Sequence, residues 1–282
     1  MPDVTSSLNR AATELRSAEI TDPLREATSL LCFALGKDRT FLITHSEYKL
    51  NRTEAALFGS MVKRRAGREP FHHITGSKEF YGLDFVVSPD VLIPRPETEM
   101  LVAKSIQVLG GMKNPVFCEV GVGSGCIAIS ILHHVQSATA VGLDISEAAV
   151  AIASRNAANH EVQERLSLFR SDIFSGVKRQ RFDLIVSNPP YIPLEEIAGL
   201  QPEVKDFEPR NALTDGGTGL TVIEKIIMES PRFLKSGSPL VIEIGIGQAG
   251  AIRTMFDSDH WRSVEIFPDF QSIPRMVWGI LA

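Results

Sequence analysis

The sequence predicts an α/β protein in which a small helical domain precedes a doubly wound, mostly parallel sheet of seven strands. Three observations predict this class. Up to about residue 70, apolar side chains recur at three- and four-residue spacing, as in amphipathic helices. From Asn114 onward, short apolar segments alternate with helical ones. The first of these segments runs into a glycine-rich stretch, "EVGVGSG", which is typical of folds that bind ligands at the carboxyl ends of their strands.

The helical domain is predicted over residues 1–75. One helix begins after Asp22, a good N-cap residue, and ends at Gly36. A later helix opens on Asn51 or Thr53. These signals indicate a small bundle of amphipathic helices.

A connector of β structure is predicted over residues 76–95. Its sequence, "EFYGLDFVV", is rich in aromatic and β-branched residues, and the turn of a hairpin is expected near Ser88 to Asp90. A new helix is predicted to start at Pro96, with acidic residues in its first turn.

The α/β domain is predicted over residues 96–282. The last two of its seven strands are separated only by a short loop, so we expect them to form an antiparallel hairpin. The predicted strands are "PVFCEVG", "TAVGLDI", "RLSLFRSD", "RFDLIVSN", "SPLVIEIG", "SVEIFPD" and "RMVWGIL".

Composition limits the function classes. The 282 residues, 44% hydrophobic and 22% charged, are ordinary for a globular protein. The longest apolar run, "CIAISIL", is too short to span a membrane, and the start of the chain lacks the pattern of a secretion signal. Three cysteines without a CxxC pair suit reduced thiols. We therefore expect a cytoplasmic protein without a membrane partner.

The charge distribution argues against a DNA-binding role. Residues 81–282 carry 17 basic and 24 acidic side chains, whereas proteins that bind a phosphate backbone usually present a basic face. The one basic cluster is "KRRAGR" at 63–68. It is either a solvated helix end or a docking surface for an acidic or RNA-containing partner.

The glycine-rich stretch predicts a cofactor site. Gly121, Gly123 and Gly125 lead into an apolar helix, which lets a ligand approach the backbone and the helix N-terminus. The next strand ends in Asp144, where a carboxylate can accept hydrogen bonds from both hydroxyls of a ribose. An acidic residue at this place suits NAD equally well. The two motifs therefore indicate a nucleoside-bearing cofactor without deciding which one.

The third strand ends in "SDIF", which offers two more candidate cofactor residues. Asp172 could accept a hydrogen bond from an adenine amino group, and Ile173 could provide an apolar surface for the ring. The alternative for Asp172 is a helix N-cap.

The fourth strand ends in "NPPY", residues 188–191, which predicts the chemistry. The two prolines fix the backbone and remove two donors, so the Asn188 side chain and the Pro189 carbonyl form a rigid pair of acceptors. Such a pair can hold a planar NH2 group, aim its nitrogen at an electrophilic methyl group and stabilise the charge that develops on it. Tyr191 can pack on the planar group. With the glycine loop and Asp144, this motif indicates S-adenosylmethionine as the cofactor.

Nearly the whole chain resembles the release-factor glutamine methyltransferases, the PrmC/HemK family of protein-(glutamine-N5) methyltransferases. "NPPY" is shared with adenine and cytosine DNA methyltransferases, but "IPRPETE" together with "QPEVKDFEPRNALTDGGTGL" is more specific. The resemblance implies methyl transfer from S-adenosylmethionine, which becomes S-adenosylhomocysteine, to the glutamine of the Gly-Gly-Gln motif in class I peptide chain release factors. It also implies that the helical domain docks the release factor.

The resemblance assigns site residues by their match to the family motifs. Those implied at the cofactor are Gly121, Val122, Gly123, Ser124, Gly125, Asp144, Asp172, Ile173 and Asn188. Those implied at the substrate glutamine are Asn188, Pro189, Pro190 and Tyr191, of which Asn188, Pro189 and Tyr191 are expected to be catalytic. Val122 stands where the family commonly has Thr. Arg95 and Glu97 of "PRPETE" either favour a helix N-terminus or shape the mouth of the active site through an ion pair or a cofactor contact.

Other residues have simpler interpretations. The pairs His72-His73 and His133-His134 have no acid or cysteine at a chelating spacing, so no metal site is expected. Cys126 has no histidine placed to activate it and is expected to be a small core residue.

Two other functions stay open at this point. An adenine-N6 DNA methyltransferase would need a basic cleft and a large target-recognition domain. A non-catalytic adaptor that binds release factors or RNA would not need the complete set of motifs found here. The lack of an obvious exposed apolar stripe favours a monomer.

Overall fold

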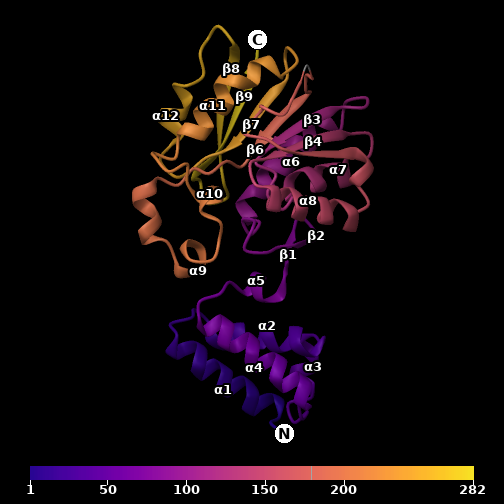
Figure 1. Ribbon diagram of the computed structural model, residues 1–282, viewed down its shortest axis with the longest axis vertical. Coiled ribbons are helices and arrows are strands. Elements are labelled where there is room, and N and C mark those ends of the chain that lie inside the picture. Colours follow the sequence, from indigo (N-terminus) through magenta and orange to yellow (C-terminus); the bar gives the residue numbers. More distant parts are fainter. Residues whose placement is uncertain (179) are drawn as a thin grey trace. The chain divides into compact units, whose positions relative to one another are not determined.

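The structure is a computed structural model that describes residues 1–178 and 180–282. The chain packs into two compact units, which are described separately (Figure 1). The N-terminal unit consists of Met1–Ser77 and of Gln201–Phe207, a segment that the sequence boundaries assign to the α/β domain. The second unit consists of Lys78–Leu200 and Glu208–Ala282. In the described part of the chain, no helix has both the length and the hydropathy to cross a bilayer.

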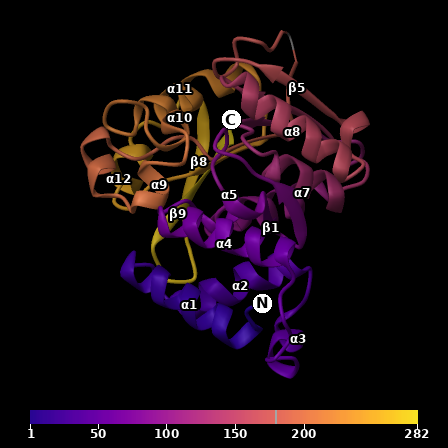
Figure 2. The ribbon, with the colours of Figure 1, turned by 60° about the horizontal axis from the view of Figure 1, so that its bottom comes forward.

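The N-terminal unit is helical (Figure 2). Its helices are α1 (Val4–Ser17), α2 (Pro23–Leu35), α3 (Arg39–Thr44), α4 (Arg52–Ala66), α5 (Phe71–Thr75) and, from the separate segment, α9 (Pro202–Lys205). Helices α1, α2 and α4 pack on one another, and their apolar faces form a core that includes Leu15, Leu30, Leu31 and Phe58. The periodicity of the sequence therefore predicted the main helices correctly.

The predicted helix ends are partly confirmed. Asn51 is the N-cap of α4, where its Oδ1 accepts a hydrogen bond from the Glu54 backbone N at 2.9 Å and the Glu54 carboxylate accepts one from the Asn51 N at 2.8 Å. Gly36 closes α2 with φ +61°. Asp22 does stand at the N-cap of α2, but its backbone is left-handed and its side chain makes no capping bond. The start of α2 therefore relies on Pro23, which is favoured in the first turn of a helix.

Glu203 anchors the segment 201–207 in the N-terminal unit. Its carboxylate accepts from Arg65 Nη1 at 3.0 Å and from Arg68 Nη2 at 2.7 Å, and Arg65 also pairs with Glu26 at 2.8 Å. The Arg65 side chain is only 10% exposed. Arg64 also pairs with Glu69. All three arginines of the basic cluster 63–68 are thus engaged in ion pairs inside the unit, which reduces the positive charge they offer to a partner.

The connector holds a β-hairpin, but its turn is not where the sequence predicted. Strands β1 (Ser77–Phe80) and β2 (Leu83–Val86) are joined by Tyr81 and Gly82, both at positive φ, whereas the turn was expected at residues 88–90. The prediction was wrong because a turn with two positive φ values is normally signalled by Asn-Gly or Asp-Gly, and Tyr-Gly is a weak version of that signal.

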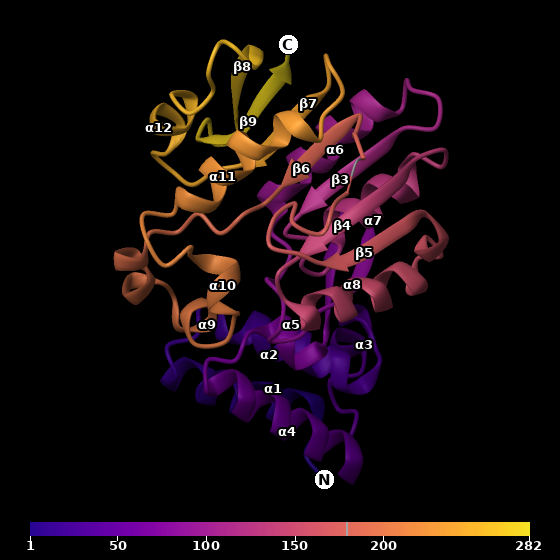
Figure 3. The same ribbon diagram turned by 45° about the horizontal axis from the view of Figure 1, so that its top comes forward.

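The second unit contains a seven-stranded sheet in the order β5-β4-β3-β6-β7-β9-β8 (Figure 3). The first five strands of this order are parallel, and β9 is antiparallel to both of its neighbours. The doubly wound sheet and its terminal hairpin are therefore confirmed. The strands are β3 (Val116–Val120), β4 (Thr139–Asp144), β5 (Leu166–Arg170), β6 (Leu184–Ser187), β7 (Pro239–Glu243), β8 (Trp261–Pro268) and β9 (Pro274–Leu281).

Helices cover both faces of the sheet. One face packs on α6 (Glu99–Leu109), α7 (Cys126–His134) and α8 (Glu147–Asn159), and the other on α11 (Thr221–Glu229) and α12 (Ala249–Arg253). The remaining short elements of this unit are η1 (Pro96–Thr98), η2 (Gln163–Arg165), η3 (Leu194–Gly199), α10 (Arg210–Leu213) and η4 (Ser230–Arg232).

The chain reverses its direction of winding between β3 and β6. Strands β3, β4 and β5 follow one another toward one edge of the sheet, and β6 then returns to pair with the other side of β3. The carboxyl ends of β3 and β6 therefore flank a crevice, which is where open α/β sheets bind their ligands.

Candidate active site

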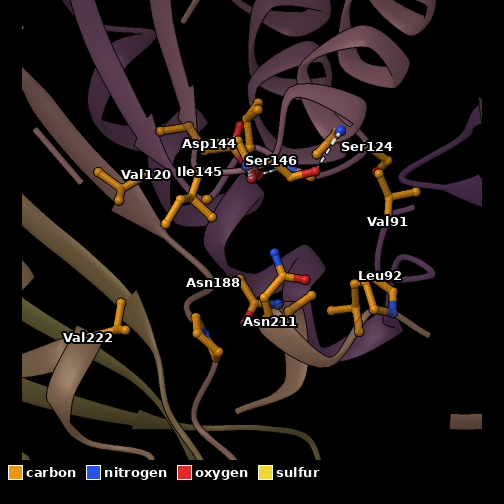
Figure 4. A pocket seen from close by; sticks show the side chains of 18 of the residues that line it. Val91, Leu92, Val120, Ser124, Asp144, Ile145, Ser146, Asn188, Asn211 and Val222 are labelled. Carbon is orange, nitrogen blue, oxygen red and sulfur yellow. Dashed lines mark hydrogen bonds between the residues drawn. The ribbon is translucent and has the colours of Figure 1, made fainter. Parts of the chain in front are cut away.

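A cavity of about 310 Å³ lies at the carboxyl ends of β3, β4 and β6. Figure 4 shows Asp144, Ile145 and Ser146 on one side of it and Asn188 and Asn211 on the other. The lining residues are numbers 90–92, 94, 95, 98, 119–124, 126, 127, 144–146, 149, 171–173, 188, 190, 209, 211, 212, 214, 215 and 222.

The glycine loop forms one wall of the cavity. Gly121 and Gly123 line it and have φ values of +77° and +53°, which favour glycine. A Cβ on Gly123 would meet no atom within 4 Å, so the space beside this residue is free for a ligand. Gly125 does not line the cavity. It is the N-cap of α7, and a Cβ there would come within 2.7 Å of the Ile129 side chain, so it serves the packing of the helix.

Asp144 joins the glycine loop to the turn after β4, with one oxygen on each. Its Oδ2 accepts from the Gly123 N at 2.9 Å, and its Oδ1 accepts from the Ser146 N at 2.9 Å. Burial raises the pKa of this carboxyl, and the backbone donors oppose the rise. Because a carboxylate oxygen accepts more than one hydrogen bond, Asp144 keeps acceptor capacity for a ligand in the cavity.

Asp172 and Ile173 line the cavity in the turn after β5. No helix starts at Asp172, so the alternative that it is an N-cap is wrong. Ile173 is nearly buried and has φ +50°, a costly conformation for a β-branched residue. Ser171 Oγ holds this turn, because it donates to the Ile173 carbonyl at 2.8 Å and accepts from the Gly176 N at 2.9 Å.

Two of the four residues of "NPPY" line the cavity. Asn188 and Pro190 line the cavity, whereas Pro189 and Tyr191 are not among its lining residues. The Asn188 amide donates from Nδ2 to Thr98 Oγ1 at 3.0 Å. Tyr191 donates from its hydroxyl to Glu243 Oε1 at 3.2 Å, and its carbonyl accepts from Gln248 Nε2 at 2.8 Å.

Thr98 and Glu243 are parts of this site that the sequence motifs did not predict. Both are 2% exposed, and Thr98 Oγ1 donates to Glu243 Oε2 at 2.6 Å. Thr98 lies in "IPRPETE" and Glu243 in "VIEIGIGQ". An acidic residue in an otherwise apolar strand was the available signal, since a carboxylate is rarely buried without partners.

Arg95 lines the cavity but does not pair with Glu97. Its Nη2 donates to both oxygens of Glu208, at 2.7 and 2.6 Å, and the Glu208 side chain is 1% exposed. Burial raises the pKa of Glu208, and the Arg95 guanidinium opposes the rise. This ion pair ties the segment before α6 to the segment before α10.

Histidine, acidic and cysteine side chains are the candidates for metal binding and for thiol chemistry. Within residues 1–178 and 180–282, no group of three or more His, Cys, Asp or Glu side chains is arranged to hold a metal ion. Cys126 lines the cavity, but burial raises the pKa of its thiol strongly, so it is a poor nucleophile.

Comparison with known proteins gives the class of this protein. Residues 99–224 match the family described as "Methyltransferase small domain". The crystal structure of a methyltransferase from Pyrococcus furiosus shares the fold, with a TM-score of 0.54 and 19% identity over 72% of this chain and 91% of that one. A doubly wound sheet whose cavity opens beside a glycine loop agrees with this match, and the chain is a methyltransferase.

The comparisons also give the family. Residues 6–76 match the "PrmC N-terminal domain". A release factor glutamine methyltransferase of Geobacter sulfurreducens is 42% identical and is aligned over 90% of this chain and 88% of its own length. One of Nitratidesulfovibrio vulgaris is 38% identical, over 96% and 93%. The chain belongs to the release factor glutamine methyltransferase family.

Proposed function

We propose that the protein transfers a methyl group from S-adenosylmethionine to the side-chain amide nitrogen of the glutamine in the Gly-Gly-Gln motif of class I peptide chain release factors. The observation that carries this proposal is the Asn188 amide. Its NH2 group is engaged by Thr98, so its oxygen is left to accept a hydrogen bond at the edge of the cavity. An acceptor in that place suits a substrate NH2 group.

The residues of the cavity fit the proposed cofactor. Gly121 and Gly123 leave room at the backbone for its amino-acid part, Asp144 has acceptor capacity for ribose hydroxyls, and Ile173 offers an apolar surface for adenine. Bound there, S-adenosylmethionine would supply an electrophilic methyl group. We infer that Asp172 accepts from the adenine amino group and that Val122 and Ser124 complete the wall of the site.

The chain's own residues orient and activate the amide nitrogen. Asn188 Oδ1 and the Pro189 carbonyl accept its two N–H bonds, which aligns the nitrogen and favours the positive charge that develops on it. The nitrogen would gain the methyl group as the bond between that group and sulfur breaks, with S-adenosylhomocysteine as the leaving group. One N–H proton can leave to solvent after the transfer. Pro190 limits movement of the acceptors, and Tyr191 is held behind them by Glu243 and Gln248.

We further propose that the N-terminal unit docks the release factor, supported by the match of residues 6–76 to the "PrmC N-terminal domain". The three cysteines are unpaired, which suits the reducing cytoplasm where translation takes place. We expect the protein to act there as a monomer on a protein substrate, without binding DNA.

The test is transfer of a radiolabelled methyl group from S-adenosylmethionine to a purified class I release factor. The controls are the release factor with Gly-Gly-Gln changed to Gly-Gly-Ala and a DNA duplex. Label on the unaltered factor alone supports the proposal. Label on DNA, or on the Gly-Gly-Ala factor at the same level, contradicts it.

Asn188→Ala should lower kcat by about a hundredfold or more, because it removes an oriented acceptor, while much of the affinity for S-adenosylmethionine is kept. Asn159→Ala is the matched control, since Asn159 is exposed on α8, and its rate should equal that of the unaltered protein. A normal rate for Asn188→Ala would show that this amide does not activate the nitrogen.

A further inference from the structure

Glu243 is a buried carboxylate at the centre of a hydrogen-bond chain that ends at Asn188. It is the last residue of β7 and is 2% exposed. Its Oε2 accepts from Thr98 Oγ1 at 2.6 Å, and Thr98 Oγ1 accepts from Asn188 Nδ2 at 3.0 Å. Its Oε1 accepts from the Tyr191 hydroxyl at 3.2 Å. The side-chain positions of Asn188 and Tyr191 therefore both depend on Glu243, which lies on another strand.

The chain of hydrogen bonds has a fixed direction when Glu243 is ionised. A carboxylate only accepts, so the single hydroxyl hydrogen of Thr98 must go to Glu243. Thr98 can then offer only a lone pair to Asn188, and Asn188 must turn its NH2 group toward Thr98. The Asn188 oxygen is consequently presented as the acceptor, which is the orientation that a substrate NH2 group requires.

We propose that Glu243 is a positioning residue, whose ionised carboxylate acts through Thr98 to hold the Asn188 amide with its oxygen toward the substrate. The inference rests on the proposed function and adds a condition to it. A protonated Glu243 has a hydrogen of its own to donate to Thr98. The Thr98 hydroxyl could then donate to Asn188 Oδ1, which would turn the amide and present its NH2 group instead.

The groups around Glu243 set its pKa, so its change of protonation falls in the pH range of ordinary assays. Burial raises the pKa of Glu243 to about 7, against the opposing effect of its hydrogen bonds from Thr98 and Tyr191. Arg275 of β9 lowers this pKa and Glu97 of η1 raises it. Cys126 of α7 also lies within electrostatic range, and its pKa is raised in part by Glu243.

The rate of methyl transfer is expected to depend on the protonation of Glu243. Ionisation of Glu243 is the active condition, so kcat/KM should rise with pH up to about 7 and then level off. Well below pH 7 the rate should fall about tenfold per pH unit, because one proton is involved. The affinity for the cofactor should follow this titration only weakly, since Glu243 is not among the residues that line the cavity.

The experiment compares pH profiles of methyl transfer to the release factor for the unaltered protein and Glu243→Gln. Glu243→Gln should lose the rising limb and lower kcat about tenfold or more at pH 8, with a smaller change in KM for the cofactor. Glu265→Gln is the matched control, because Glu265 is an exposed carboxylate on β8 of the same sheet. Its profile should equal that of the unaltered protein.

A second pair of variants tests the chain of hydrogen bonds even if Glu243→Gln fails to fold. Thr98→Ser keeps the hydroxyl and should keep most of the rate, whereas Thr98→Val removes it and should behave as Glu243→Gln does. Equal rates for Thr98→Ser and Thr98→Val, or an unchanged rising limb in Glu243→Gln, overturn the inference. If the unaltered protein labels no release factor, the proposed function fails instead, so the two failures are distinguishable.

Discussion

Asn156 should be one of the most costly polar residues to replace, although no motif points to it. It lies on α8 with 0% exposure. Its Nδ2 donates to the Val86 carbonyl at 3.0 Å and to the Ser124 carbonyl at 2.8 Å, and its Oδ1 accepts from the Val86 N at 2.8 Å. One side chain therefore ties the hairpin to the glycine loop.

The expected loss of stability follows from these three bonds. Asn156→Ala removes all of them and leaves three backbone groups without this partner, at about 1 kcal/mol each, or roughly 3 kcal/mol of unfolding free energy. For a unit of this size, 1 kcal/mol corresponds to about 2 to 4 °C, so the Tm should fall by about 6 to 12 °C.

The assay can follow the second unit alone, because both tryptophans, Trp261 and Trp278, lie in its strands β8 and β9. Thermal unfolding monitored by tryptophan fluorescence should show the fall in Tm for Asn156→Ala. Asn159→Ala makes the same chemical change at an exposed position of α8 and should stay within about 0.5 kcal/mol of the unaltered protein. If the two variants unfold at the same temperature, the buried bonds contribute nothing and the reasoning is refuted.

Two further predictions concern the stability of the separate units. Asn51→Ala should cost the N-terminal unit about 1 kcal/mol of unfolding free energy, because the α4 capping box is lost. Far-UV circular dichroism should then show unfolding at a lower temperature, while the tryptophan transition is unchanged. No change in either signal would contradict this prediction. Arg95→Met should cost about 3 kcal/mol in urea unfolding, because it leaves the buried Glu208 carboxylate without its partner. Lys235→Met, whose ion pair with Asp183 is more exposed, should cost well under 1 kcal/mol, and equal losses for the two variants would count against the role of burial.

The sequence predicts the fold well where local signals are strong. Strands such as β6 and β7 are short runs of mainly apolar residues, and Asn51 precedes α4 with a glutamate three residues later. The hairpin turn at Tyr81 and Gly82 was missed because Tyr-Gly is a weak turn signal and because part of its support is tertiary: Tyr81 N donates to the Glu99 carboxylate at 3.0 Å.

The candidate site was predictable to the extent that its residues lie in contiguous motifs. Asp144 ends β4, Gly121 and Asn188 directly follow β3 and β6, and parallel strands bring their carboxyl ends to one edge. Thr98 and Glu243 are 145 positions apart in the chain and meet only through folding. Periodicity and local spacing carry no information on such a pair, and the same holds for Arg95 and Glu208.

The segment Gln201–Phe207 gives the two units an unusual covalent relation. Because it belongs to the N-terminal unit, the chain passes between the units three times, at residues 77 and 78, 200 and 201, and 207 and 208. Neither unit can therefore be excised with a single cut. A fragment that starts at Lys78 would keep Glu203 but lose Arg65 and Arg68, and a fragment that ends at Ser77 would keep the arginines without their carboxylate. Replacing the N-terminal unit of this chain as a whole thus means exchanging two separate pieces of sequence together, because an exchange at the first boundary alone would leave Glu203 without Arg65 and Arg68.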